Sequence, residues 1–275
     1  MNGPPTDDEL LENAKTGDGA AMDALVRRYA ALVYGGAVRQ SGDAALAADI
    51  SQAVFLIFLR RVATIRSARS LPAWFLQTTR FASMDAQRAR RRRAHHEKRA
   101  ARPEPDMNQA NADRDEIAAL DDAIARLRQS DRIIIAMRFF RGSELSAIAA
   151  ALGIAEDAAR KRIARAVARL KHLMVKSDAT LSVDALLAAA ATASMPAGVL
   201  ESCAALVSGK GVASSSATVI AQRVLRSLAM QKLMIVGIAA AASLAVAVAG
   251  VAALPPLRVP GHRMVKLAAA TAPVP

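Results

Sequence analysis

Apolar side chains recur every three or four positions through much of the first 175 residues, which is the period of a helix buried on one side. Residues 8–36 follow this period and predict a helix that breaks at Gly35-Gly36. Ser41-Gly42-Asp43 is typical of a helix start. The apolar positions from there to Arg61 lie on more than one side of the predicted helix, so we expect it to be buried against several neighbours.

A short polar loop, Thr64–Leu71, precedes a third predicted helix that begins near Pro72. Proline suits the first helical turn, where its missing N–H costs nothing. The helix opens with Trp74-Phe75-Leu76 and then becomes strongly basic. Its basic run consists of Arg88, Arg90, Arg91, Arg92, Arg93, Lys98, Arg99 and Arg102, opposed only by Glu97.

Residues 102–115 contain two prolines and no apolar period, so they predict a flexible linker and a domain boundary. Beyond the linker the helical period returns at Ile117 and continues into a very apolar segment, Ile133–Phe140. A turn at Arg141-Gly142, a short helix ended by Gly153 and a longer helix over about 156–174 complete this second group. The pattern thus predicts two small all-α domains.

Residues 176–232 are rich in Ala and Ser and give no pattern that predicts a packed domain. Residues 233–254 then form a run of 22 residues without a charge. As a helix this run would extend roughly 33 Å, enough to cross the hydrocarbon core of a membrane. A buried Ala-rich helix is the alternative, and 255–275 would be a short tail.

The chain has 37 Lys and Arg against 24 Asp and Glu, a formal net charge of +13. This excess favours a polyanionic partner, either nucleic acid or an anionic lipid surface. Cys203 is the one cysteine, so no disulfide can form within the chain, and the histidines lack metal-ligand spacing. Residues Met1–Leu10 lack the basic and apolar regions of a signal peptide. We expect a cytoplasmic protein with no cofactor and no metal.

The segment 144–174 has the form of a helix-turn-helix: a short helix, a Gly-centred turn and a longer basic helix. On a helical wheel, Lys161 and Arg165 point away from the apolar stripe, and further cations flank them. Such a helix can rest on its own domain and present cations to a DNA major groove. The alternative is a solvated basic face. The predicted contacts are Arg160, Lys161, Arg162, Arg165 and Arg169.

The third predicted helix combines aromatics and cations, since Trp74 and Phe75 precede Gln77, Arg80 and Phe81. Unstacked bases can pack on aromatic rings while arginines meet phosphates, so the combination suits strand-separated DNA. Core packing is the competing interpretation for Trp74 and Phe75.

Residues 127–170, LRQSDRIIIAMRFFRGSELSAIAAALGIAEDAARKRIARAVARL, resemble region 4 of the sigma-70 family, in its extracytoplasmic-function (ECF) group. In that family region 4 reads the −35 promoter element. Ala155 stands where a capping hydroxyl is usual, which should weaken the start of the recognition helix by about 1 kcal/mol.

The amino-terminal half resembles region 2 of the same family. AADISQAVFLIFLRR, residues 47–61, resembles the helix that docks on the polymerase β′ subunit, which implies that Asp49, Gln52 and Phe55 bind polymerase. AWFLQTTRFASMDAQRARRRR, residues 73–93, resembles the helix that reads the −10 element. The implied −10 contacts are Arg66, Arg69, Trp74, Gln77, Arg80, Phe81 and Arg88.

The resemblance implies a sigma factor, not an enzyme, whose partners are core RNA polymerase (β′ and β subunits), promoter DNA and a possible anti-sigma factor. With the apolar run it implies cytoplasmic domains anchored to the bacterial inner membrane. A helix-turn-helix regulator that never binds polymerase and a membrane-surface adaptor remain as alternatives. The expected parts are region 2 at 8–101, a linker at 102–115, region 4 at 116–175, an extension at 176–232 and a transmembrane helix at 233–254.

Overall fold

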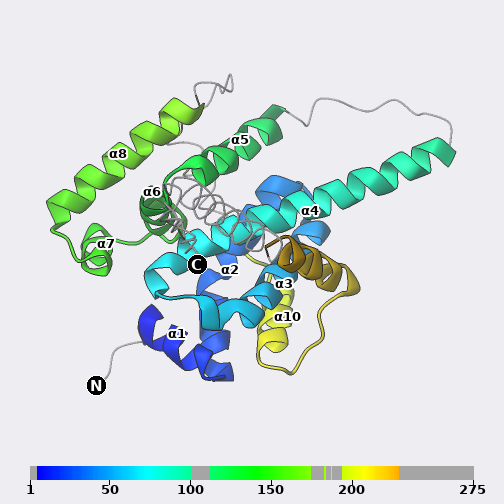
Figure 1. Cartoon of the computed structure of the whole chain (residues 1–275), viewed down its shortest axis with the longest axis horizontal. Coiled ribbons are helices and arrows are strands. Elements are labelled where there is room, and N and C mark those ends of the chain that lie inside the picture. Colours follow the sequence, from blue (N-terminus) through cyan, green and yellow to red (C-terminus); the bar gives the residue numbers. More distant parts are fainter. Residues whose placement is uncertain (1–4, 101–111, 175–182, 184–186, 188–193, 229–275) are drawn as a thin grey trace, which may run out of the picture. The chain divides into compact units, whose positions relative to one another are not determined.

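The computed structural model describes residues 5–100, 112–174, 183, 187 and 194–228. Within these residues every regular element is helical, as the sequence predicts (Figure 1). The principal elements are α1 (Asp7–Lys15), α2 (Gly19–Ser41), α3 (Ala44–Arg61), α4 (Leu71–Ala100), α5 (Ala112–Arg126), α6 (Gln129–Ile135), α7 (Leu145–Leu152), α8 (Glu156–Met174), α10 (Ala197–Val207) and a helix over residues 215–228.

The amino-terminal segment forms two helices, so the prediction of one helix over 8–36 is right at its start and wrong in the middle and at its end, because α1 stops at Lys15 and α2 runs on to Ser41. The side chain of Asp18 accepts hydrogen bonds from the N–H groups of Ala20 and Ala21 at 2.8 and 3.3 Å and starts α2. Gly35-Gly36 does not break the helix. A Cβ atom on Gly36 would lie 3.2 Å from Cγ2 of Thr79, so glycine at this position allows α2 and α4 to approach closely.

The predicted start of the next helix is confirmed. Gly42 adopts a left-handed φ of 61° that ends α2, and Asp43 caps the first N–H groups of α3 at 3.0 and 3.1 Å. Between α3 and α4 the predicted loop contains two 3₁₀ turns, Val62–Thr64 and Ala68–Ser70. Pro72 lies in the first turn of α4, as predicted. The predicted linker falls largely outside the described residues, and α5 already begins at Ala112.

The core of the first helical group is a cluster of aromatic rings around Phe75, which has no exposed surface. The Phe75 ring lies 4.8 Å from Tyr29 of α2, 5.7 and 5.0 Å from Phe55 and Phe58 of α3, and 5.1 Å from Trp74. Burying each such side chain contributes roughly 1.5–3 kcal/mol. The cluster therefore holds α2, α3 and α4 together.

The second helical group packs α7 and α8 on α6 and on a π-helical turn, Ala136–Phe140. Its core contains Ile133, Met137, Ile148 and Ala159, with Ile163 partly buried against them. Gly153 has a left-handed φ of 63° and ends α7, which confirms the predicted turn.

The extension contains packed helices that the sequence pattern did not predict. Helix α10 contacts α2 and α3, and the helix over 215–228 buries Ala217, Ile220, Ala221 and Val224. Cys203 of α10 is also buried, and burial raises the pKa of its thiol to about 12. This cysteine is a small apolar core residue. The apolar run 233–254 lies outside the described residues, and none of the described helices is long and apolar enough to span a membrane.

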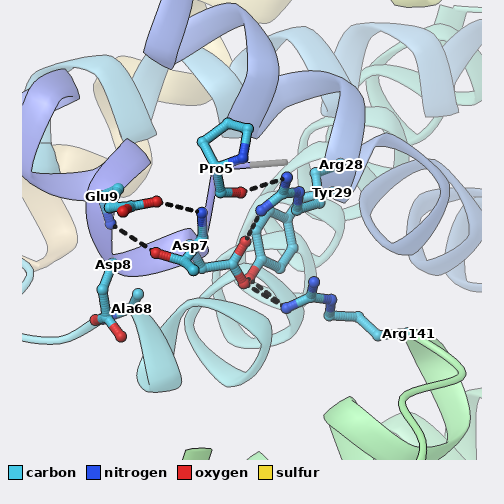
Figure 2. A network of polar contacts seen from close by, with 9 residues as sticks. Pro5, Asp7, Asp8, Glu9, Arg28, Tyr29, Ala68 and Arg141 are labelled. Carbon is cyan, nitrogen blue, oxygen red and sulfur yellow. Dashed lines mark hydrogen bonds and ion pairs between the residues drawn. The ribbon is translucent and has the colours of Figure 1, made fainter. Parts of the chain in front are cut away.

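A polar network around Asp7 joins α1, α2 and the turn after Phe140 (Figure 2). The Asp7 carboxylate accepts hydrogen bonds from Arg28 at 2.6 Å, from the Tyr29 hydroxyl at 2.7 Å and from Arg141. The Arg141 guanidinium also lies 5.0 Å from the centre of the Tyr29 ring. Burial alone would raise the pKa of Asp7, but the hydrogen bonds from Arg28 and Tyr29 and the charge of Arg141 outweigh it and hold the pKa below 3.8.

Replacing Asp7 with Asn should lower the free energy of unfolding by about 1.5–3 kcal/mol at pH 7, because the charge-assisted hydrogen bonds are lost. Since the folded-state pKa of Asp7 lies below 3.8, its contribution is complete well above that pH and is lost as the pH falls through the lowered pKa. Urea unfolding of both forms at several pH values measures this. The gap between wild type and Asp7→Asn should shrink below pH 3.8.

The exposed pair between Glu12 and Lys15 provides the control, since Glu12→Gln should change stability by less than about 1 kcal/mol. A gap between wild type and Asp7→Asn that stays the same in strong acid would contradict the role assigned to the carboxylate.

Candidate nucleic-acid and protein interfaces

Helix α8 places its basic residues as the sequence predicts for a DNA-reading helix. Ala159, Ala166 and Leu170 are buried, and Ile163 and Val167 are partly buried, so the helix rests on its domain through one apolar stripe. All of the predicted −35 contacts are exposed, namely Arg160, Lys161, Arg162, Arg165 and Arg169.

Two of these cations already have acidic partners. Arg160 lies 3.4 Å from Asp157 one turn earlier in the same helix, and Arg169 donates to Asp131 of α6. Asp131 is largely buried, which anchors the carboxyl-terminal part of α8 on α6. The Arg165 side chain donates from Nε to the backbone carbonyl of Lys161 at 3.3 Å. The structure thus favours Lys161, Arg162 and Arg165 as the cations most open to a phosphate or a base edge.

The predicted −10 residues divide into two sets. Arg66 and Arg69 of the loop before α4, and Gln77 and Arg88 of α4, are exposed. Trp74, Arg80 and Phe81 are half-buried.

Packing explains the half-buried set in part. The Trp74 ring lies 5.7 Å from Phe58 and 5.1 Å from Phe75, so one side of it belongs to the core. Arg80 donates from Nε to Asp122 of α5 at 2.8 Å. The sequence alone missed Asp122, because the pair joins residues 42 positions apart.

A second acidic residue of α5 also binds side chains of the first helical group, one of them a cation. Asp121 accepts from Gln40 at 2.9 Å and lies 3.4 Å from Arg39, and the Arg39 guanidinium lies 5.0 Å from the centre of the Phe140 ring. The adjacent acids Asp121-Asp122 are visible in the sequence, but nothing there shows which cations they meet.

The predicted polymerase residues lie on α3 in different surroundings. Asp49 and Gln52 are half-buried and lie one turn apart. Phe55 has no exposed surface and packs against Phe75, so its ring supports α3 from the inside and offers no surface for a partner.

Ser214 of the extension contacts both Asp49 and Gln52. Its hydroxyl donates to Oδ1 of Asp49 at 2.7 Å, and its backbone N–H donates to Oε1 of Gln52 at 3.0 Å. Sequence reasoning missed Ser214, because a serine in an Ala/Ser-rich stretch carries no distinguishing signal. No three His, Cys, Asp or Glu side chains come together as a metal site anywhere in the described part of the chain.

Comparison with known families gives two matches, one covering α3 and most of α4 and one covering α6 to most of α8. The family described as Sigma-70 region 2 matches residues 25–93, and the family described as Sigma-70, region 4 matches residues 123–172.

Individual relatives match over more than half of the chain. ECF RNA polymerase sigma factor SigL of Mycobacterium tuberculosis is 33% identical over 167 residues, which cover 58% of this chain and 93% of SigL. ECF RNA polymerase sigma factor BldN of Streptomyces coelicolor is 28% identical over 177 residues, which cover 60% of this chain and 65% of BldN.

Replacing Lys161 with Ala should weaken binding of the chain to duplex DNA and reduce the slope of log affinity against log salt by about 1, because one phosphate contact is lost. Titration of labelled duplex at several salt concentrations measures the slope. Lys210→Ala removes the same charge from an exposed turn of the extension and serves as the control. Equal slopes for the two variants would argue against α8 as the DNA-binding helix.

Proposed function

The chain belongs to the extracytoplasmic-function group of sigma-70 factors, and on this premise we propose that it directs RNA polymerase to specific promoters while tethered to a membrane. As a sigma factor it acts in transcription initiation and is not itself an enzyme. Its partners are core polymerase and promoter DNA. The observation that carries the proposal is the presence of both regions, in this order, in one chain whose α4 and α8 expose cations.

We assign promoter recognition to two surfaces. Region 4, proposed as residues 116–175, grips the −35 duplex with Lys161, Arg162 and Arg165 of α8, whose exposure supports this role. Region 2, proposed as residues 8–101, captures the separated −10 strand. There Arg66, Arg69 and Arg88 meet phosphates, and Gln77 and the open side of Trp74 meet bases.

Region 2 also carries the polymerase-docking surface in this proposal. Asp49 and Gln52 lie on one face of α3, where they can hydrogen-bond to the β′ subunit once that face is accessible. The linker at 102–115 joins the two regions and sets the span between the promoter elements. A separate anti-sigma factor, where one exists, would compete for the same faces.

Purified chain added to core polymerase should give promoter-dependent transcripts on cognate templates that core polymerase alone does not give. Arg88→Ala should reduce this product severalfold and leave core binding unchanged, because Arg88 is exposed on α4 and is assigned to DNA. Arg126→Ala, which removes an exposed cation at the end of α5, is the matched control. Failure to obtain promoter-dependent product from any template would refute the function.

The tether is proposed for residues 233–254, with the amino-terminal side in the cytoplasm, where DNA and polymerase are located. Charge does not determine this orientation, since Arg223, Arg226 and Lys232 precede the segment and Arg258, Arg263 and Lys266 follow it. The orientation follows from the DNA-binding function.

Carbonate extraction of cell membranes should leave the full chain in the pellet. A chain carrying both Val246→Arg and Val248→Arg should move to the soluble fraction, since each central arginine costs about 2.5–3.5 kcal/mol in a membrane. Replacing the same valines with leucine keeps the segment apolar and provides the control. Release of the unmodified chain by carbonate would exclude a spanning segment.

A further inference from the structure

We propose that residues 197–228 of the extension inhibit the chain by covering the face of α3 that docks on polymerase. This inference rests on the proposed function, because the covered residues are those assigned to polymerase binding. It gives the extension a role that neither region 2 nor region 4 supplies.

Apolar packing brings the extension onto region 2. In the helix over 215–228 the buried residues are spaced by three and four positions, and they are Ala217, Ile220, Ala221 and Val224. Helix α10 packs on α2 and α3 and buries Cys203, Ala204, Leu206 and Val207. In Figure 1 both helices lie beside α3. Such a stripe is typical of a helix that packs against a specific surface.

Polar contacts fix where the extension lies. The Arg27 guanidinium of α2 binds both carboxylate oxygens of Glu201 in α10, at 2.8 and 3.0 Å. This arrangement lowers the pKa of Glu201, because Arg27 hydrogen-bonds to its ionised form. At the other end, Arg223 lies 3.6 Å from Asp85 of α4. The extension is therefore held on α2 and on α4, on either side of the docking face.

Ser214 occupies the centre of this arrangement. Its hydroxyl donates to Asp49 and also accepts from the N–H of Ala217 at 3.0 Å. One side chain therefore both caps the helix over 215–228 and binds α3. Its backbone N–H donates to the side-chain Oε1 of Gln52 at 3.0 Å. A polymerase surface that reaches Asp49 and Gln52 must first displace Ser214.

Polymerase thus binds an open arrangement, in which residues 197–228 have left α3. The closed arrangement, in which they cover α3, lowers the apparent affinity for polymerase. If the closed arrangement holds about 90% of the molecules, the apparent affinity for polymerase falls about tenfold. Any change that loosens the extension and leaves α3 intact should restore that affinity.

The sharpest test compares two nearly isosteric substitutions in the full chain. Asp and Asn both cap helices well, so Ser214→Asp and Ser214→Asn keep the start of the last helix. Asn can still donate to Asp49, whereas Asp places a second carboxylate against it. Ser214→Asp should bind core polymerase about tenfold more tightly than wild type, and Ser214→Asn should bind like wild type.

A second pair tests the apolar contact. Ala221 is fully buried and Gln222 beside it is exposed, so Ala221→Glu should open the chain and Gln222→Glu should not. Hydrogen exchange of backbone amides reports opening independently of polymerase. In Ser214→Asp and Ala221→Glu, exchange should rise over 215–228 and stay slow in α2, which shows that region 2 remains folded.

The outcomes separate the inference from the function on which it rests. If every form binds polymerase with the same affinity, the inference is overturned and the proposed function stands. Weaker binding by Ser214→Asp than by Ser214→Asn overturns it as well, because the extension would then assist docking. If no form binds polymerase even when hydrogen exchange shows the extension released, the proposed function itself fails.

Discussion

Burial of the Phe75 ring is the constraint on which the two faces of region 2 depend. Rings from α2 and α3 surround it, so α4 cannot rotate about its axis without exposing a large apolar side chain. This fixed rotation buries Thr78 and Thr79 and turns Gln77 outward. The missing side chain at Gly36 provides the space for Thr79. The same rings set the rotation of α3, with Phe55 inward and Asp49 near the surface.

The charge balance then determines which cations can meet DNA. With 37 basic and 24 acidic residues, cations outnumber the acidic side chains available to pair with them. Asp7, Asp121 and Asp131 are largely buried, and each ties an arginine from a different segment. Asp122 differs because its side chain is 52% exposed, so its pair with Arg80 contributes only about 0–1 kcal/mol. A phosphate can compete for Arg80 far more easily than for Arg39, whose side chain is only 9% exposed.

The sequence predicts what depends on neighbouring residues and fails where distant contacts decide. The starts at Asp43 and Pro72, the turn at Gly153 and the apolar stripe of α8 follow from local periodicity and capping. Helix α2 runs through Gly35-Gly36 without a break and brings Gly36 against Thr79 of α4, a contact between distant residues that the sequence does not reveal. Phe55 shows the same limit, because the resemblance implies a contact residue, whereas its position is set by Phe75. The bond between Ser214 and Asp49 spans 165 positions in an unpatterned stretch.

The composition of the extension suits a contact that must open. Three of the eight residues that α10 and the helix over 215–228 bury are alanines, which bury little apolar area, so the contact is weaker for its length than one made by larger side chains alone. Tethering compensates for this weakness. A segment covalently joined to its target acts at an effective concentration that can far exceed the concentration of a free partner. Polymerase therefore competes with a weak contact at high local concentration, and modest changes in the extension are sufficient to shift the balance between the two occupants of α3.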